Sequence, residues 1–153
     1  MIEGRHYQNA YVTRDIDKAV ERVTAHADVR SMFQFEATTE VLTSNGRGPQ
    51  TSKLAFIWVG DLQYEFIQPV TEAVPVFSSM LSQDDQPRFH HSCARVPDWA
   101  DFRRRVDDQP YPVVIEGEGD QLKFLYLDAR ELLGHYLEYT WMSDAAWQRL
   151  GGR

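Results

Sequence analysis

A repeated pattern in the two halves of the chain is the feature that most constrains the fold. The segment QNAYVTRD begins at Gln8 and the segment HSCARVPD begins at His91, and each ends seven positions later in an aspartate. Each aspartate suits the N-cap of a helix, and the residues before it, 6–13 and 89–96, have the character of a strand. The shared order and spacing predict two structurally equivalent halves.

The same plan continues after each aspartate. Apolar residues at helical spacing predict one helix with the stripe Ile16, Ala19, Val20 and Val23, and a second near 98–108 with the stripe Trp99, Phe102 and Val106. Three strand-like runs follow each helix, at 33–42, 53–59 and 62–68 in the first half and at 112–116, 122–127 and 134–141 in the second. The chain is therefore predicted to be an α+β protein made of two βαβββ modules.

The length of 153 residues suits one domain spanning 1–153. We expect the first module at 5–69, a linker at 70–87, the second module at 88–142 and a C-terminal tail at 143–153. The linker is rich in proline and polar residues and has room for a short helical turn. The segment TSNGRGPQTS at 43–52 is predicted to be a loop, and Gly60-Asp61 a tight turn between two strands.

Composition excludes several classes of function. The chain has 16 basic and 23 acidic residues, a net charge of −7, and its basic residues are scattered apart from Arg103, Arg104 and Arg105. Nucleic-acid binding is not expected, because phosphate binding needs a concentrated positive face. The apolar runs are far shorter than a bilayer span, so we expect a cytoplasmic protein without membrane contact. A single cysteine, Cys93, excludes an intrachain disulfide and a thiolate cage for zinc.

Two glutamates occupy equivalent places in the halves. Glu65 lies in YEFIQP and Glu138 in LEYTWM, each inside the last apolar strand of its module. A buried carboxylate without a partner is costly, so each needs a cation, a hydrogen-bond network or a solvated cleft. If the halves pack around a pseudo-twofold axis, these glutamates can meet Gln8 and His91 from the first strands. Carboxylate, imidazole and amide donors together suit a divalent metal such as zinc, nickel, cobalt, manganese or iron.

Other interpretations of these residues stay open at the level of sequence. Either glutamate alone could point to solvent from a sheet with one exposed face. His6 lies two residues before Gln8 and shares its face, so a shifted register would make His6 the ligand. His90 is expected to face the opposite side from His91, as a core or rim residue, and His135 is out of phase with Glu138.

Further residues have plainer expected roles. Tyr136 and Thr140 share the face of Glu138 and are candidates to line a pocket or fill the wall of the cleft. Cys93 is expected to be a small core residue. The four tryptophans, Trp58, Trp99, Trp141 and Trp147, are expected to be packing residues, and Arg103 to Arg105 a solvated helix face.

The chain resembles the vicinal oxygen chelate superfamily, which includes glyoxalase I, methylmalonyl-CoA epimerase, extradiol dioxygenases and bleomycin-resistance proteins. The segments that carry the resemblance are QNAYVTRDIDKAV, VGDLQYEFIQP, FHHSCARVPDWADF and FLYLDARELLGHYLEYT, in that order. The resemblance places the metal ligands on the first and last strands of each module, at Gln8, Glu65, His91 and Glu138. Many members have histidine where this chain has Gln8, which leaves the two-histidine, one-carboxylate iron site of extradiol dioxygenases incomplete.

The resemblance also implies a class of chemistry. It suggests an isomerase, epimerase or lyase of the glyoxalase or methylmalonyl-CoA epimerase type, in which one divalent metal stabilises the enolate of a small carbonyl or thioester substrate. Glu138 is then the candidate general base, and Glu65 a ligand or second base. The alternatives are a metal-free protein that sequesters an aromatic ligand, as bleomycin-resistance proteins do, and an iron-dependent dioxygenase. The resemblance further implies a homodimer.

Overall fold

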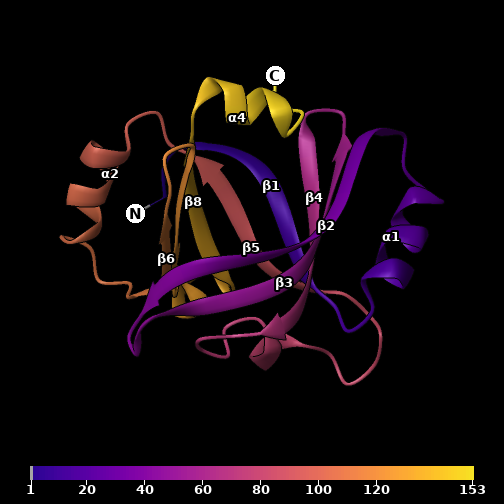
Figure 1. Ribbon diagram of the computed structural model, residues 1–153, viewed down its shortest axis with the longest axis horizontal. Helices are drawn as coiled ribbons and strands as arrows, with labels where there is room; N and C mark the ends of the chain where they lie inside the picture. Colours follow the sequence, from indigo (N-terminus) through magenta and orange to yellow (C-terminus); the bar gives the residue numbers. More distant parts are fainter. Residues whose placement is uncertain (1) are drawn as a thin grey trace.

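A computed structural model describes residues 2–153 of the protein (Figure 1). Its first half contains β1 (Arg5–Val12), α1 (Ile16–Thr24), β2 (Val29–Thr43), β3 (Gly46–Val59) and β4 (Leu62–Thr71). A connection with the short helix η1 (Ser78–Met80) leads to the second half. That half contains β5 (Arg88–Arg95), α2 (Trp99–Val106), β6 (Val113–Glu118), β7 (Leu122–Leu127), α3 (Arg130–Leu133), β8 (Tyr136–Met142) and α4 (Asp144–Arg149). The predicted βαβββ order is confirmed in both halves.

The eight strands close into one barrel with the order β1-β4-β3-β2-β6-β7-β8-β5. In each half the first and last strands pair in parallel, β1 with β4 and β5 with β8, and the remaining neighbours are antiparallel. The halves join where β1 runs antiparallel to β5. They meet again at the opposite side, through the single pair Leu42 and Glu116 of β2 and β6. The first and last strands of both modules are thereby neighbours in the barrel wall.

The hairpin of β2 and β3 is much longer than its counterpart, β6 and β7. It crosses in front of β1, β5 and β8 in Figure 1 and covers one side of the barrel. The expected loop at 43–52 is wrong, because β3 begins at Gly46 and only Ser44 and Asn45 form the turn. The glycines, proline and polar residues of this segment are compatible with a strand because one of its faces is open to solvent.

Both helix caps predicted from the aspartates are present. The Asp15 carboxylate accepts a hydrogen bond from the backbone N–H of Lys18, and the Asp98 carboxylate accepts one from that of Asp101. Each cap satisfies a backbone donor that the first helical turn leaves without a partner. The apolar stripes of α1 and α2 pack on the outside of the barrel, at opposite ends of the view in Figure 1.

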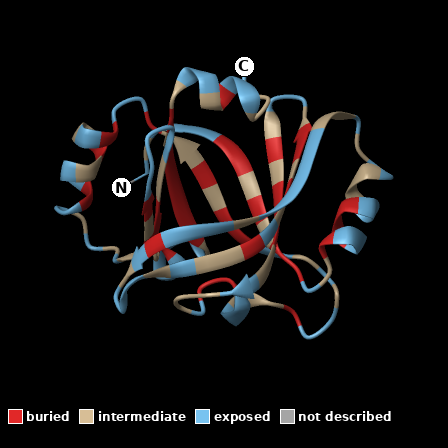
Figure 2. Cartoon of the chain, viewed as in Figure 1, coloured by how far each residue is buried: buried red, intermediate tan, exposed pale blue. Residues whose placement is uncertain are grey.

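Burial follows the strand period most clearly in the strands that join the two halves. Buried residues alternate with less buried ones along these strands, whereas β2 is largely exposed and β3 has buried, intermediate and exposed residues (Figure 2). Trp58, Trp99 and Trp147 are buried in apolar clusters and Trp141 packs at the edge of one, which confirms their expected packing role. In the arginine run, Arg104 and Arg105 are exposed and Arg103 is half-buried beside Glu116.

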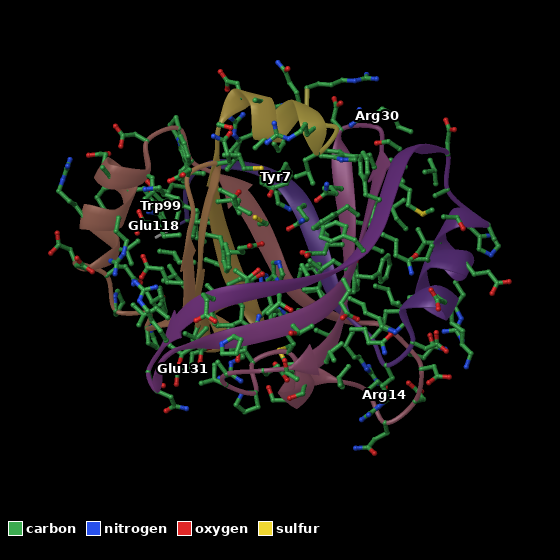
Figure 3. All side chains as sticks on the ribbon, viewed as in Figure 1. Tyr7, Arg14, Arg30, Trp99, Glu118 and Glu131 are labelled. Carbon is green, nitrogen blue, oxygen red and sulfur yellow. The ribbon has the colours of Figure 1, made fainter. Side chains whose placement is uncertain are left out.

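The C-terminal tail forms α4, which the sequence did not predict. Its Trp147 packs edge-on against the rings of Tyr7 and Trp58, and the Trp58 indole N–H donates to the carbonyl of Leu150. The label of Tyr7 in Figure 3 lies directly under this helix. Helix α4 therefore covers the end of the barrel next to β1. Among residues 2–153, no helix is long and apolar enough to cross a membrane.

The packing of Trp147 can be tested by truncation. Replacing this side chain, which is only 7% exposed, with alanine leaves a cavity between α4 and the barrel. We expect Trp147→Ala to lower the free energy of unfolding by about 3–5 kcal/mol in urea titrations. The exposed Arg149→Ala on the same helix is the control and is expected to change it by less than about 0.5 kcal/mol. Equal losses in the two variants would contradict this packing role.

Candidate metal centre

The four predicted ligands come from the four strands around the junction of the halves. Gln8 lies on β1, Glu65 on β4, His91 on β5 and Glu138 on β8, and all four side chains are buried. Strand pairing brings them together in a symmetrical way. Glu65 is the neighbour of Ala10 across β1 and β4, and Glu138 is the neighbour of the equivalent residue of β5. The barrel interior thus receives one ligand candidate from each strand.

The side-chain atoms converge on a small volume. The Nε2 atom of His91 lies 3.0 Å from Oε2 of Glu138 and 3.5 Å from Oε2 of Glu65. Ligand atoms of these three residues all lie within 4.8 Å of one another. The side-chain oxygen of Gln8 faces both carboxylates, with its amide terminus 3.3 Å from each Oε2. The alternative in which the glutamates point to solvent is therefore excluded.

The orientation of the Gln8 amide is linked to Gln63. The Gln8 amide nitrogen donates to Oε1 of Gln63 over 2.6 Å, and this orientation leaves the Gln8 oxygen facing two carboxylates. In this orientation a cation would stabilise the three oxygen acceptors that face one another, and the Gln63 Nε2 atom has no hydrogen-bond partner among residues 2–153. Turning the Gln8 amide would let its nitrogen donate to Glu65 and Glu138, but would place two glutamine oxygens 2.6 Å apart unless Gln63 also turned. The oxygen set can therefore accommodate a bound cation, and turning both amides satisfies the same groups without one.

A chain of hydrogen bonds sets the tautomer of His91. The Val76 carbonyl can only accept, so Nε2 of His90, 3.2 Å away, must donate to it. A neutral His90 then has its lone pair on Nδ1, which lies 2.9 Å from Nδ1 of His91 and accepts its N–H. This leaves Nε2 of His91 to face the carboxylates. A metal-binding histidine is commonly oriented in this way through its second nitrogen.

Burial and charge shift the pKa values of the cluster. Burial lowers the pKa of His90 well below its usual value, and the neighbouring His91 adds to this. Burial also lowers the pKa of His91, but hydrogen bonds to Glu138 and Glu65 outweigh burial and raise it to about 9. For Glu65, burial raises the pKa of the carboxyl, His91 opposes the rise, and the charge of Glu138 adds to it. In the absence of metal, the His91 imidazolium supplies the cation between the carboxylates.

Two tyrosines of the cluster were missed from the sequence. Tyr126 packs edge-on against the His91 ring at 4.8 Å, and burial, followed by the charges of Glu138 and Glu65, raises the pKa of its phenol well above normal. Tyr7 is buried beside Gln8, and its hydroxyl lies 3.2 Å from Oγ1 of Thr140. Strand alternation would have placed Tyr7 on the other face, but the pairing of β1 with β5 shifts register between His6 and Gln8. Such an irregularity has no clear sequence signal.

The alternative ligand His6 is excluded. Its ring is exposed and lies within hydrogen-bonding distance of the Gln8 carbonyl and the Asn9 side chain. His135 is only half-buried and its Nδ1 atom is next to the carbonyl of Tyr136, so it also lies outside the cluster, as expected. His90 is in the core as predicted, yet it contacts His91 directly.

The remaining expectations for this face are partly confirmed. Thr140 lines a cavity above the cluster. Tyr136 does not, because its ring stacks on His90 with centroids 4.8 Å apart. Cys93 is fully buried in an apolar cluster with Tyr7, which confirms the expected core role.

Two adjoining cavities open onto the glutamates. One of about 270 Å³ lies between the β2–β3 hairpin and β1, β8 and α4, and another of about 150 Å³ extends toward Phe77 and Tyr126. Both are lined by Glu65 and Glu138 and share residues of β2, β3 and β7. The carboxylates are therefore reachable by a small molecule, although they are almost wholly buried.

The fold and the cluster together define a protein of paired βαβββ modules with a carboxylate, imidazole and amide site in the barrel. Comparison with known families agrees. Residues 7–126 match the profile of the Glyoxalase/Bleomycin resistance protein/Dioxygenase superfamily, and the chain belongs to this superfamily. No curated protein sequence matches the chain significantly.

Solved structures share the fold at low sequence identity. Methylmalonyl-CoA epimerase from Mycobacterium tuberculosis is 15% identical with a TM-score of 0.67, and 97% of each chain is covered. A hypothetical protein from Bacillus halodurans C-125 is 15% identical with a TM-score of 0.63, covering 92% of this chain and 95% of the other. A 4-hydroxymandelate synthase variant from Streptomyces coelicolor is 15% identical with a TM-score of 0.59, covering 90% of this chain and 48% of the other. At this identity the likeness shows the fold alone.

The raised pKa of His91 gives a prediction for protein stripped of metal by a chelator. A histidine whose pKa rises from 6.5 to about 9 stabilises the fold below pH 6.5, and this contribution is lost as pH rises through 9. We expect NMR titration to find the His91 imidazole titrating near 9 in the parent. In Glu138→Gln the pKa should fall toward or below 6.5, because a charged acceptor is removed.

The exposed Glu131→Gln, which alters the same charge outside the cluster, is the control and should leave the His91 titration unchanged. A parent His91 that titrates near 6.5 would contradict the ion pairs described above.

Proposed function

We propose that the protein is a metal-dependent isomerase, epimerase or lyase that acts on a small carbonyl compound. The observation that carries this proposal is the convergence of one buried side chain from each of β1, β4, β5 and β8 at a cavity. The membership of the superfamily supports it, and so does the structural likeness to methylmalonyl-CoA epimerase.

Gln8, Glu65, His91 and Glu138 would hold the metal. Their charges suit a divalent cation, because two carboxylates balance it while the amide and imidazole remain neutral. When bound, such an ion polarises a carbonyl oxygen and stabilises the negative charge that develops on it during loss of a neighbouring proton. The buried position strengthens this electrostatic effect.

The glutamates supply the proton transfers. Glu138 takes the proton from the carbon next to the carbonyl. Glu138 then returns this proton to a neighbouring carbon, or a second acid delivers a different proton to the other face of the same carbon while Glu138 releases its own to solvent. Glu65 lines the same cavity from β4 and is the candidate second base, which would deliver a proton taken up from solvent. Two bases on opposite strands of one cavity allow approach from two sides of a flat intermediate.

A binding protein without turnover is the second candidate. The apolar lining of both cavities favours it, because such a lining also suits sequestration of an apolar molecule. The four donors that face one another argue for the enzyme, since a binding protein has no need to bury two carboxylates beside a histidine.

Metal content tests the proposal first. Protein incubated with zinc, nickel, cobalt, manganese or iron and then desalted is expected to retain about one equivalent of one of these metals by mass spectrometry. Glu138→Gln and His91→Gln should each lower metal affinity by about tenfold or more, because each removes a ligand. Glu131→Gln is the matched control and should retain the metal. A parent that binds none of the five metals would overturn the proposal.

Proton exchange tests the chemistry itself. The metal-loaded protein should catalyse exchange of deuterium from heavy water into the carbon next to the carbonyl of an accepted substrate, read by NMR. We expect Glu138→Gln to slow this exchange by at least about 100-fold. Oxygen uptake with catechols, without such exchange, would favour the dioxygenase alternative instead.

The hydrogen-bond chain behind His91 gives a further prediction. His90→Phe keeps a ring in the same core position but removes the acceptor for the His91 Nδ1–H. We expect metal affinity to fall by about 10–100-fold while the ligand count stays the same. Tyr136→Phe, which keeps the ring stacked on His90, is the control and should bind metal normally. Unchanged affinity in His90→Phe would show that His91 needs no such orientation.

A further inference from the structure

The cavities above the cluster have an unusual charge composition. Glu65 and Glu138 are the only charged side chains that line either of them, and no lysine or arginine does so. The other lining residues are apolar, aromatic or uncharged polar. A bound divalent metal would neutralise the two carboxylates, and the rest of the cavity would then carry no formal charge. A phosphate or carboxylate on the substrate would find no cationic partner inside.

Several basic side chains form ion pairs on other surfaces. Arg95 pairs with Asp144, and Arg103 pairs with Glu116 and Asp107. Arg130 pairs with Asp128 beside the other end of β8. None of these arginines lines either cavity. The overall charge of −7 adds repulsion for an anion that approaches the protein.

Aromatic rings form much of the cavity wall. Phe35 and Phe56 meet with centroids 5.7 Å apart on the hairpin side, and Tyr7 lies on the opposite side near α4. Phe35 is 46% exposed and Leu122 is 41% exposed, although both line the cavity. Large apolar side chains that remain open to solvent at a cavity are covered when an apolar ligand binds, and this burial favours binding.

We propose that the substrate carries, next to its metal-chelating oxygens, an uncharged apolar group, best a flat aromatic ring. This group lies between Phe35 and Phe56 of the hairpin and the β1 and β8 side of the barrel. The inference rests on the proposed function for the chelating end of the substrate. It assigns the substrate class, an uncharged aromatic carbonyl compound, and excludes carbonyl compounds whose tail bears phosphate or carboxylate groups inside the cavity.

A series of hydroxamic acids tests the tail while the chelating head stays constant. Acetohydroxamic acid has no ring, benzohydroxamic acid has one, and its 4-methyl and 4-carboxyl derivatives differ in charge at similar size. Affinities are measured by NMR titration of labelled protein, both zinc-loaded and metal-free, since this method also detects weak binding. The difference in affinity between zinc-loaded and metal-free protein measures the contribution of the hydroxamate head. The differences in affinity between the compounds measure the contribution of the tail in the cavity.

We expect benzohydroxamic acid to bind at least about tenfold more tightly than acetohydroxamic acid, because the ring buries apolar surface. The 4-carboxyl derivative should bind at least about tenfold more weakly than the 4-methyl derivative, because its charge is buried without a partner. Equal binding of all four compounds to the zinc-loaded protein would overturn the substrate class and leave the metal site intact. Failure to retain zinc would instead count against the proposed function, and the ring and charge preferences in the metal-free protein would still decide the substrate class.

A change of charge at the cavity mouth gives a gain-of-binding test. Phe35→Arg places a cation at an exposed position that lines the cavity, so we expect it to reverse the preference and favour the 4-carboxyl over the 4-methyl derivative. Met32→Arg is the matched control, because Met32 is 45% exposed on the same strand and lines neither cavity. Unchanged preferences in Phe35→Arg, or the same change in both variants, would contradict the assigned position of the tail.

Discussion

The site depends on one electrostatic constraint, the burial of two carboxylates beside each other. Glu65 and Glu138 share the interior of a barrel, where water screens their repulsion less than it does in bulk solution. His91 lies within 3.5 Å of both carboxylates. As an imidazolium it offsets their repulsion directly. As a neutral side chain it would instead be a ligand to a metal ion that takes the place of its proton. The pairing of β1 with β5 and the closure of the barrel hold these groups in one place.

The duplicated module explains the symmetry of the site, and small differences between the halves explain its asymmetry. Both modules supply a glutamate at the same register of their last strand. The first strands differ, because one supplies the amide of Gln8 and the other an imidazole. Each of these two groups has its own orienting neighbour, Gln63 for the amide and His90 for His91. With a metal bound and His91 neutral, the two carboxylates alone would balance the charge of the metal.

The sequence predicted those parts of the fold and site that repeat. The caps Asp15 and Asp98 fixed where each helix begins, and the matching spacing of the first strands pointed to Gln8 and His91, which both lie in the buried cluster. Sequence failed where one strand departs from regular alternation, as at Tyr7, where a register shift turns a neighbouring residue inward. It also failed at Tyr126, because its role depends on the position of His91 on a distant strand.

Segments outside the repeated plan were also beyond prediction. The residues 43–52 have the composition of a loop, yet all of them except the turn residues Ser44 and Asn45 belong to β2 or β3. No local pattern reveals the pairing partner of these strands or their solvent-exposed face. Helix α4 is too short for periodicity to identify, and its position depends on the contact of Trp147 with Tyr7 and Trp58. The structure of both segments therefore depends on tertiary contacts, whereas the positions of the helix caps depend on the local sequence.

The two parts of the barrel are under different physical constraints. The four strands that carry the cluster are buried, so a change there disturbs the packing or the charge balance. The β2–β3 hairpin contributes Phe35 and Phe56 to the cavity, and Phe35 lies on the largely exposed β2, so this side chain can change at little cost to the fold. Under the proposed function, chelation would depend on the strands that form the barrel core, while the choice of substrate would depend on the hairpin. For this reason a fold shared at 15% identity does not transfer a substrate, and the side chains of the hairpin are the place from which to infer it.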